Sequence, residues 1–229
     1  MEHWVYTTTI FGHQASFNMD TLITMWISML FLIVLALLTT RKLDMIPSKL
    51  QLVAEGIIKY FNNIAKASMG SDNAQKHIAI ILTLFMFILT ANLFGQLPLK
   101  IVHIAHGELA SPNNDINMTA AMALVVSIYY IFYGIKAQGG KFFFKGFSIS
   151  GIIITLVDWL ELFVRPFSLA LRLFANILAG ELIISTFLGL VAIGLPLPFM
   201  LFELFVAFIQ AIVFTLLSTT YIALAIQEE

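Results

Sequence analysis

The sequence has no cysteine and little charge. The lack of cysteine excludes disulfides, thiolate metal ligands and cysteine nucleophiles. Only 11% of the residues are charged and 60% are hydrophobic, whereas soluble domains are about 25% charged and about 45–50% apolar. A water-soluble globular fold and a disordered chain are therefore both excluded. With a net charge of −1, the chain also has no basic field for nucleic acid.

Signatures of catalysis and of nucleotide binding are missing too. The sequence has no glycine-rich phosphate loop, no Ser-His-Asp set and no HExxH pattern, so we expect no enzyme activity, no bound nucleotide and no cofactor. His103 and His106 have a spacing that a metal site could use, but a solvated loop explains them better. No internal repeat is visible, so the inverted repeat of many secondary transporters is absent.

Three uncharged stretches are long enough to cross a membrane as helices. Each has about 20 residues, the length that spans a hydrocarbon core of about 30 Å. They are Thr21–Thr40, Ile78–Leu99 and Ile116–Ile135. The first is expected to be retained, because no Lys or Arg precedes it and no small-residue cleavage site follows. Asn92, in the second stretch, is expected to form an interhelical hydrogen bond.

The last part of the chain is apolar with scattered charges, and it contains the break Gly194-Leu-Pro196-Leu-Pro198. Two prolines remove backbone donors and push the preceding residues out of helical geometry. We therefore predict two long helices, about 148–188 and about 199–226, around a break at 189–198. Both are longer than a simple span, so they must tilt strongly or project from the membrane. Together they form a long helical hairpin.

The segment Pro47–Lys66, between the first two spans, has an apolar and a polar face at helical spacing. Its length is marginal for spanning and its polarity is too high. We predict an amphipathic helix on the membrane surface with Pro47 in its first turn; a soluble helix docked on a partner is the alternative. The fold class is thus an all-α membrane protein with about five embedded helices and one surface helix.

The whole chain is expected to form a single membrane domain, with peripheral spans and the surface helix at 1–146 and the hairpin at 147–229. Lys and Arg concentrate in two loops, one between the first two spans and one after the third. The positive-inside rule places both loops in the cytoplasm. The amino terminus is then outside and the carboxyl terminus inside.

Charged side chains inside the hairpin need a reason, because each costs about 2.5–3.5 kcal/mol at mid-membrane. At about 100° per residue, polar side chains of the first hairpin helix share one stripe. They are Asp158, Glu161, Arg165, Ser168, Arg172 and Asn176. Arg172 has no carboxylate three or four residues away, so its counter-charge must come from elsewhere in the chain or from a partner. The stripe is either an ion path or a set of structural pairs such as Arg165 with Glu161.

Glu181 lies about 180° around the helix from Arg172, so it needs another partner. On the second hairpin helix, Glu203, Gln210 and Tyr221 share one face. Packing of the hairpin would bring Glu181 near Glu203 or Gln210. Two carboxylates held close together at low dielectric cannot both ionise easily, which makes such a pair a proton-binding station.

The segment RPFSLALRLFANILAGELI, at Arg165–Ile183, resembles subunit a of the F-type ATP synthases, most specifically in the pattern LRLFxNxxAGEL. Three further runs resemble the same family: TANLFGQLP (90–98), SPNNDINMTAAMAL (111–124) and IQAIVFTLLSTTYIALAIQEE (209–229). The resemblance implies a non-catalytic stator subunit of the bacterial inner membrane. Its hairpin would pack against a rotating ring of c subunits, with peripheral-stalk b subunits and the lipid bilayer as further partners.

The resemblance also implies a function for Arg172, which matches the essential arginine of the family. This residue would attract the ionised carboxylate of each passing c subunit and block ion leak between two offset half-channels. Arginine suits the role because it stays charged under all conditions. The implied function is ion translocation, of protons first, coupled to ATP synthesis. A stand-alone cation/proton antiporter and a purely structural membrane subunit are the alternatives.

The remaining polar positions divide between two half-channels. Glu203 stands where many relatives carry histidine, and Asp158 stands where many carry glutamate. The resemblance and the stripe together assign Asn176, Glu181, Glu203 and Gln210 to the inlet, and Asp158, Glu161 and Ser168 to the other half-channel. None of these residues is expected to hold a metal.

Overall fold

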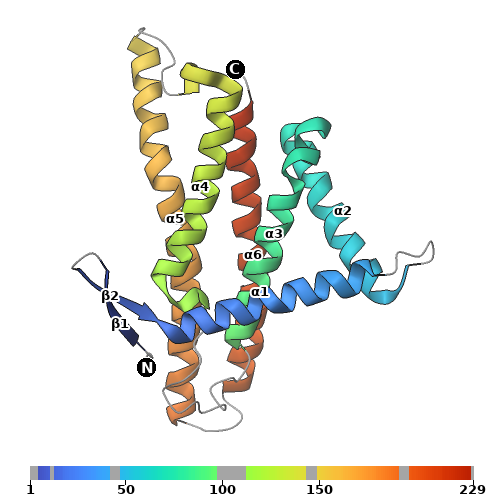
Figure 1. Cartoon of the computed structure of the whole chain (residues 1–229), viewed down its shortest axis with the longest axis vertical. Helices are drawn as coiled ribbons and strands as arrows, with labels where there is room; N and C mark the ends of the chain where they lie inside the picture. The colour runs from blue at the N-terminus through green and yellow to red at the C-terminus, as the bar shows by residue number, and fades with distance from the viewer. Residues whose placement is uncertain are drawn as a thin grey trace. The chain divides into compact units, whose positions relative to one another are not determined.

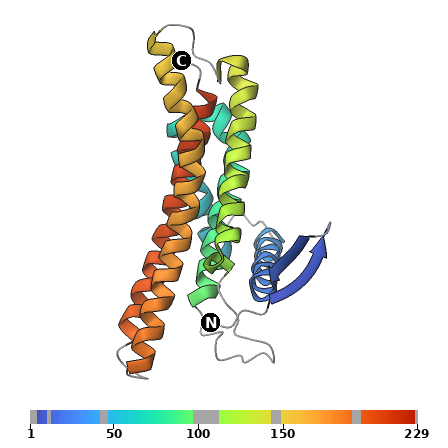
Figure 2. The ribbon, with the colours of Figure 1, turned by 90° about the vertical axis from the view of Figure 1, so that its left-hand side faces the viewer.

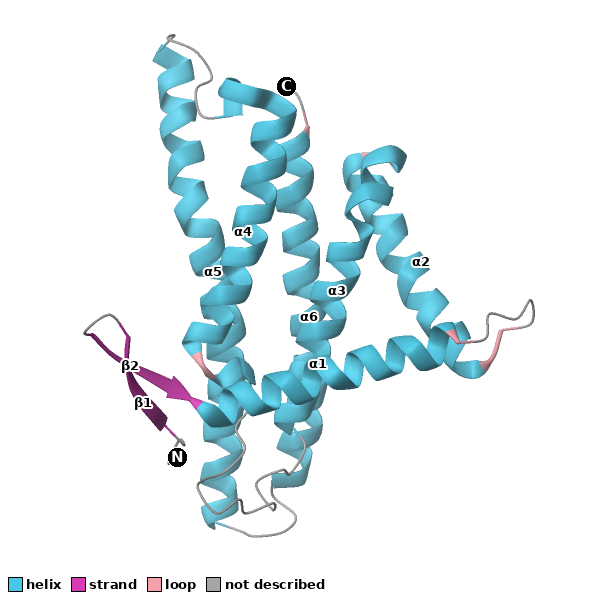
Figure 3. Cartoon of the chain, viewed as in Figure 1, coloured by secondary structure: helices cyan, strands magenta, loops and turns pink. Residues whose placement is uncertain are grey.

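The computed structural model describes residues 5–10, 13–41, 47–96, 112–142, 149–190 and 196–227. Helices make up nearly all of these residues (Figures 1 and 3). Five of the described helices are long and apolar enough to cross a membrane. They are α1 (Met19–Thr40), α3 (Ser71–Gln96), α4 (Ile116–Gln138), α5 (Ile149–Leu190) and α6 (Pro196–Ile226). The prediction of an all-α membrane protein is confirmed.

Two short strands precede the helices and were not anticipated from the sequence. β1 (Val5–Ile10) pairs antiparallel with β2 (His13–Asn18), with Val5 opposite Asn18 (Figure 3). Two 3₁₀ turns complete the described elements: η2 (Pro112–Asn114) before α4 and η3 (Gly139–Phe142) after it. His103 and His106 lie outside the described residues, so the structure does not bear on them.

The proline-containing break lies where the sequence predicted it. α5 ends at Leu190 and α6 begins at Pro196. The second helix starts earlier than the predicted residue 199, so that Pro196 and Pro198 both fall in its first turn. Proline is tolerated there because the first N–H groups of a helix have no intrahelical acceptor. α5 also accommodates an internal proline, Pro166.

The predicted surface helix is α2 (Lys49–Met69), and its start corrects one prediction. Pro47 lies before the helix rather than in its first turn, because Ser48 is the N-cap: its hydroxyl accepts a 3.3 Å hydrogen bond from the Gln51 amide. The helix ends at Met69, and the C-cap residue Gly70 has a φ of +81°, a conformation that side-chain-bearing residues rarely adopt.

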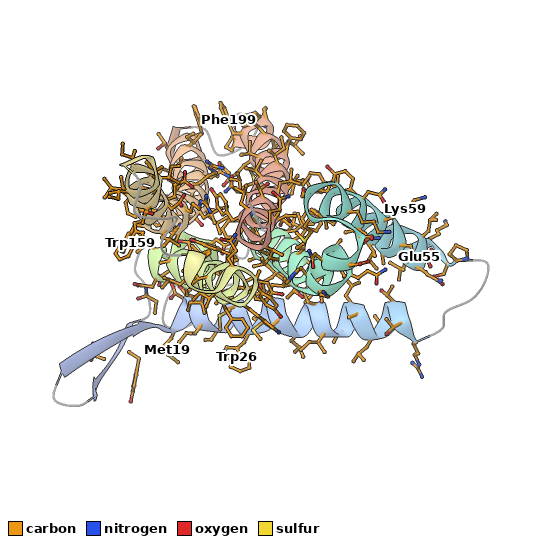
Figure 4. The ribbon with its side chains drawn as sticks, turned by 90° about the horizontal axis from the view of Figure 1, so that it is seen from above. Met19, Trp26, Glu55, Lys59, Trp159 and Phe199 are labelled. Carbon is orange, nitrogen blue, oxygen red and sulfur yellow. The ribbon has the colours of Figure 1, made fainter. Side chains whose placement is uncertain are left out.

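α2 matches the predicted two-faced pattern only in part, because the apolar Leu50 and Val53 are exposed and the polar Gln51 is buried. One face is buried, and Phe61 packs on Phe85 of α3 with ring centroids 4.6 Å apart. The opposite face exposes Glu55 and Lys59, which are labelled in Figure 4, together with apolar residues such as Leu52. This combination suits a membrane–water interface, and the location of α2 on the membrane surface stays a prediction.

The described chain divides into two compact units. Unit 1 comprises Met1–Leu43, Met86–Met118 and Phe174–Ala211, and unit 2 comprises Asp44–Phe85, Thr119–Leu173 and Ile212–Glu229. α3, α4, α5 and α6 therefore each contribute one part to both units. The packing within each unit is described separately below.

In unit 1, α1 turns its polar side chains inward and its apolar side chains outward. Trp26, labelled in Figure 4, is 65% exposed. The buried residues of the helix are all polar: Asp20, Thr21, Thr24 and Ser28. A helix in a soluble protein buries its apolar side instead. Exposed apolar side chains and buried polar ones are what a lipid surrounding favours. The polar side of α1 contacts η2, and Asn18 donates a 2.6 Å hydrogen bond to Asp115, which follows η2.

In unit 2, polar contacts join α3 to α4 and α4 to α6. The buried His77 of α3 lies 2.8 Å from the Tyr129 hydroxyl of α4 through its Nδ1 atom. The amide of Gln138, at the end of α4, donates to the backbone carbonyls of Ala225 (3.2 Å) and Gln227 (2.8 Å). These bonds occupy carbonyls that the last turn of α6 leaves without a partner.

Hydroxyl side chains in the second half of α6 bond to their own helix. Ser218, Thr219 and Thr220 each donate to the carbonyl four residues earlier, at 2.8, 2.8 and 3.0 Å. The hydroxyl groups of this polar run thus find their hydrogen-bond acceptors within their own helix.

Candidate functional site

Three polar side chains of α5 and α6 are buried within unit 1, and we call them the α5–α6 cluster. Glu181 is 6%, Glu203 8% and Gln210 7% exposed. The C-terminal part of α5 and the N-terminal part of α6 run side by side there (Figure 2), and Phe187 stacks on Phe199 with ring centroids 4.3 Å apart. The hairpin predicted from the sequence therefore brings both acids into one packed region.

The Glu203 side chain reaches the backbone of α5 next to Glu181. A Cβ atom added to Gly180 would overlap the Oε1 atom of Glu203 and would lie 2.9 Å from its Cγ atom. Only glycine leaves room for the carboxylate at this position, which directly precedes Glu181. The geometry brings the Glu203 carboxylate to the turn of α5 that bears Glu181.

We predict that Gly180→Ala lowers ion transport strongly, because the added methyl group displaces the Glu203 carboxylate from α5. The measurement is ATP-driven ion pumping by the reconstituted complex. Gly189→Ala is the matched control on the same helix, since a Cβ there meets no atom within 4 Å. Equal pumping rates for the two variants would show that the position of Glu203 against Gly180 has no functional importance.

The η2 turn adds polar groups that the sequence did not single out. Asn114 donates a 2.7 Å hydrogen bond from its Nδ2 atom to Oε2 of Glu181. Its neighbour Asn113 donates a 2.7 Å bond to Oδ1 of Asn92, and Asn92 donates a 3.1 Å bond to the carbonyl of Ala207 on α6. The predicted interhelical hydrogen bond of Asn92 is confirmed. Asn113 and Asn114 were missed because their only signal was a pair of turn-forming residues before a helix.

Gln210 lies two turns after Glu203 on α6, so the two side chains share one face of the helix. The Nε2 atom of Gln210 has no hydrogen-bond partner among the described residues. A buried amide donor of this kind is available to a group that the described chain does not supply.

A second polar site lies within unit 2, and we call it the Asp158 pocket. It has a volume of about 300 Å³. It is lined by Gln138, Phe142, Asp158, Glu161, Leu162, Arg165, Leu224 and Ala225. The structure thus brings together two carboxylates predicted for one half-channel. Ser168, the third predicted member, is half-buried but is not among the described residues that line the pocket.

Arg165 is held by two contacts at the edge of the Asp158 pocket. It forms an ion pair with Glu161, one turn earlier on α5. Its guanidinium carbon also lies 5.0 Å from the ring centroid of Tyr221, a cation–π geometry. The structural pairing considered from the sequence is therefore present, and it involves Arg165 rather than Arg172.

Arg172 is exposed on α5, next to the exposed side chain of Leu171. No ion pair joins it to an acidic residue within the part of the chain that the structure describes. Asn176 is half-buried one turn later, and within the same part of the chain no side-chain hydrogen bond joins it to the α5–α6 cluster. The cation of Arg172 is thus presented on an outer surface of the helix.

These features define a class of protein. The described chain has five helices apolar enough to cross a membrane, and three of them, α1, α5 and α6, carry a buried carboxylate. A permanent cation, Arg172, is exposed on α5. Such a chain is a multi-pass membrane protein that serves ion transport.

The comparisons with known proteins identify the family. The family model described as ATP synthase A chain matches residues 22–223. The chain is also similar to the ATP synthase subunit a of Gloeobacter violaceus, with 42% identity over 209 residues, which are 91% of this chain and 84% of that protein. The chain belongs to the ATP synthase A chain family. It is a non-catalytic membrane subunit, and its work is ion transport linked to ATP synthesis.

Proposed function

We propose that the chain translocates protons through two half-channels at its contact with a rotating c-ring. The observation that carries this proposal is the exposed Arg172, which lacks an acidic partner among the described residues. A permanent cation in an apolar environment needs an anion, and a carboxylate on a neighbouring subunit supplies one. Each ring carboxylate would ionise beside Arg172 and take up a proton after leaving it.

The two polar sites support an assignment of the half-channels. The inlet contains the α5–α6 cluster, where Glu181 and Glu203 lie among buried polar groups and Gln210 offers a free amide donor. Asn176 belongs to the inlet by its place between Arg172 and Glu181 on α5. The other half-channel contains the Asp158 pocket, with Ser168 on the same face of α5.

The proposed function also implies a membrane, an orientation and partners for the subunit. The chain is a multi-pass protein, and we place it in the bacterial inner membrane with its amino terminus outside and its carboxyl terminus in the cytoplasm. Residues 147–229 form the hairpin that faces the ring, and residues 1–146 form the peripheral part. The exposed apolar and charged face of α2 suits the membrane surface and a contact with peripheral-stalk b subunits.

Cysteine cross-linking tests the contact with the ring, since the native chain has no cysteine. Ala175→Cys places a thiol one turn after Arg172 on an exposed position of α5. Oxidation of complexes whose c subunits carry a cysteine near their carboxylate is expected to yield a covalent dimer of the two subunits. Ala36→Cys is the matched control, because it is an exposed alanine of the apolar helix α1.

Two results would contradict the proposal. One is the same yield of cross-linked dimer from Ala36→Cys and Ala175→Cys. The other is ion exchange across vesicles by the purified chain without its partners, which would favour the stand-alone antiporter.

A further inference from the structure

The η2 turn is held on several sides within unit 1. Pro112 and Asn113 are buried, and Asn113 is 0% exposed. The polar face of α1 contacts the turn, and Asp115, the next residue in the chain, accepts the hydrogen bond from Asn18. A turn with this many neighbours has a defined position rather than a loose one.

Asn114 presents a donor to the carboxylate at the centre of the α5–α6 cluster. A primary amide donates hydrogen bonds but neither takes up nor releases a proton in the physiological range. The 2.7 Å bond to Oε2 of Glu181 therefore cannot pass a proton on. A donor of this kind favours the ionised form of a carboxylate, which is the form that accepts a proton.

Asn113 and Asn92 connect the same turn to α6. Their hydrogen bonds run from η2 to α3 and from α3 to the carbonyl of Ala207. Ala207 lies one turn after Glu203 and nearly one turn before Gln210 on α6. One turn of the chain thus holds Glu181 through Asn114 and the α6 members of the cluster through Asn113.

We infer that η2 positions the inlet acids. Asn114 keeps Glu181 ready to accept a proton, and the Asn113–Asn92 pair holds α6 in the position that keeps Glu203 and Gln210 in the cluster. This inference rests on the proposed function, because it refines how the inlet works. Both asparagines of the turn and Asn92 are positioning residues, since none of them carries the proton.

Three other acids lie on elements that contact η2 or α5 within unit 1, or directly follow η2 in the chain. Glu203 approaches from α6, against Gly180. Asp115 follows Asn114 in the chain, and the buried Asp20 belongs to α1. All three are acids, whereas Asn114 donates a hydrogen bond to the Glu181 carboxylate.

The test measures passive proton conductance of the reconstituted membrane sector, without the ATP-forming part, as a function of pH on the inlet side. Asn114→Leu removes the amide at similar volume. The pH of half-maximal conductance is expected to rise by about one unit, the equivalent of one hydrogen bond to a charged group. Asn114→Gln, which keeps an amide, is expected to restore most of the wild-type profile. Asn117→Leu is the control: it removes an exposed amide of α4 that donates to Asp115, while the bond from Asn114 to Glu181 stays in place, and it leaves the profile unchanged.

Asn113→Leu tests the Asn113–Asn92 contact to α6 separately from the Asn114 bond to Glu181. It is expected to lower the maximal conductance without moving the pH profile, because Asn114 still faces Glu181. The amount of each variant in the purified complex is measured in parallel. If Asn114→Leu does not assemble, Asn114→Ala carries the same expectation, because it removes the amide without adding a branched apolar side chain.

An unchanged pH profile in an assembled Asn114→Leu or Asn114→Ala complex overturns the inference. Glu181→Gln distinguishes this failure from a failure of the proposed function. If Glu181→Gln abolishes conductance while the Asn114 variants behave as wild type, only the positioning role is wrong. If Glu181→Gln conducts normally, the inlet assignment itself is wrong.

Discussion

Arg172→Ala is expected to reduce gradient-driven ATP synthesis to the level of membranes without the complex, while the subunits still assemble. The reason is that the described chain gives this cation no acid of its own, so its removal costs no internal ion pair. Under the proposed function, the substitution removes the charge that would make a ring carboxylate release its proton at one place only. Without that charge, passive leak between the half-channels is expected to rise. The measurements are ATP synthesis, passive conductance and subunit composition.

A second substitution separates charge from shape at the same position. Arg172→Lys keeps a cation, but an ammonium group loses its proton more readily than a guanidinium group when it leaves water. It is expected to assemble and to couple poorly. Normal ATP-driven pumping by Arg172→Ala would refute the proposed mechanism.

Glu181→Gln is expected to slow proton translocation far more than Glu161→Gln. Glu181 is 6% exposed and is held by Asn114 in a buried cluster, where a group that exchanges protons contributes on the order of 10²-fold or more to a rate. Glu161 is paired with Arg165, and its side chain is 45% exposed. Its removal therefore leaves a neighbouring carboxylate, Asp158, in the same pocket. We expect the Glu161→Gln rate to stay within about threefold of wild type, as fits an exposed pair.

Initial rates of proton pumping at equal amounts of assembled complex compare the two variants. The substitutions are chemically identical and lie on the same helix, so each serves as the control of the other. Equal losses would reject the assignment of Glu181 to the inlet. A larger loss in Glu161→Gln would move the rate-limiting proton transfer to the Asp158 pocket.

Much of the fold could be predicted because it depends on length and on helix-breaking residues. The spans follow from runs without charge, and the hairpin follows from Pro196 and Pro198, which allow a helix to begin but not to continue. The start of α2 was misplaced because Ser48 competes with Pro47 for the end of the helix. A capping hydroxyl outweighed the preference of proline for a first turn.

The inward face of α1 could have been predicted but was not. Asp20, Thr24 and Ser28 recur every four residues in an otherwise apolar helix, which marks one buried polar face. The short β-hairpin gave no such signal. Two strands without a core of their own depend on contacts made elsewhere, such as the bond from Asn18 to Asp115.

The candidate site was predictable in its charges and not in its neutral groups. A charged residue in an apolar run is conspicuous because lipid penalises it, which is how Glu181 and Arg172 were found. Asn114 lies 67 residues before Glu181 in the sequence, in a turn where asparagine is ordinary. Only the folded chain shows that this amide faces a carboxylate.

The self-bonded hydroxyls of α6 have a consequence for where protons cannot go. A Grotthuss relay needs hydroxyl hydrogens that can swing between successive acceptors, and those of Ser218, Thr219 and Thr220 are already engaged with their own backbone. We therefore expect these hydroxyls of α6 not to relay protons, although the sequence there is polar. Under the proposed function, proton transfer would then be limited to the positions that carry acids, and protons would not cross the membrane along the hydroxyls of α6.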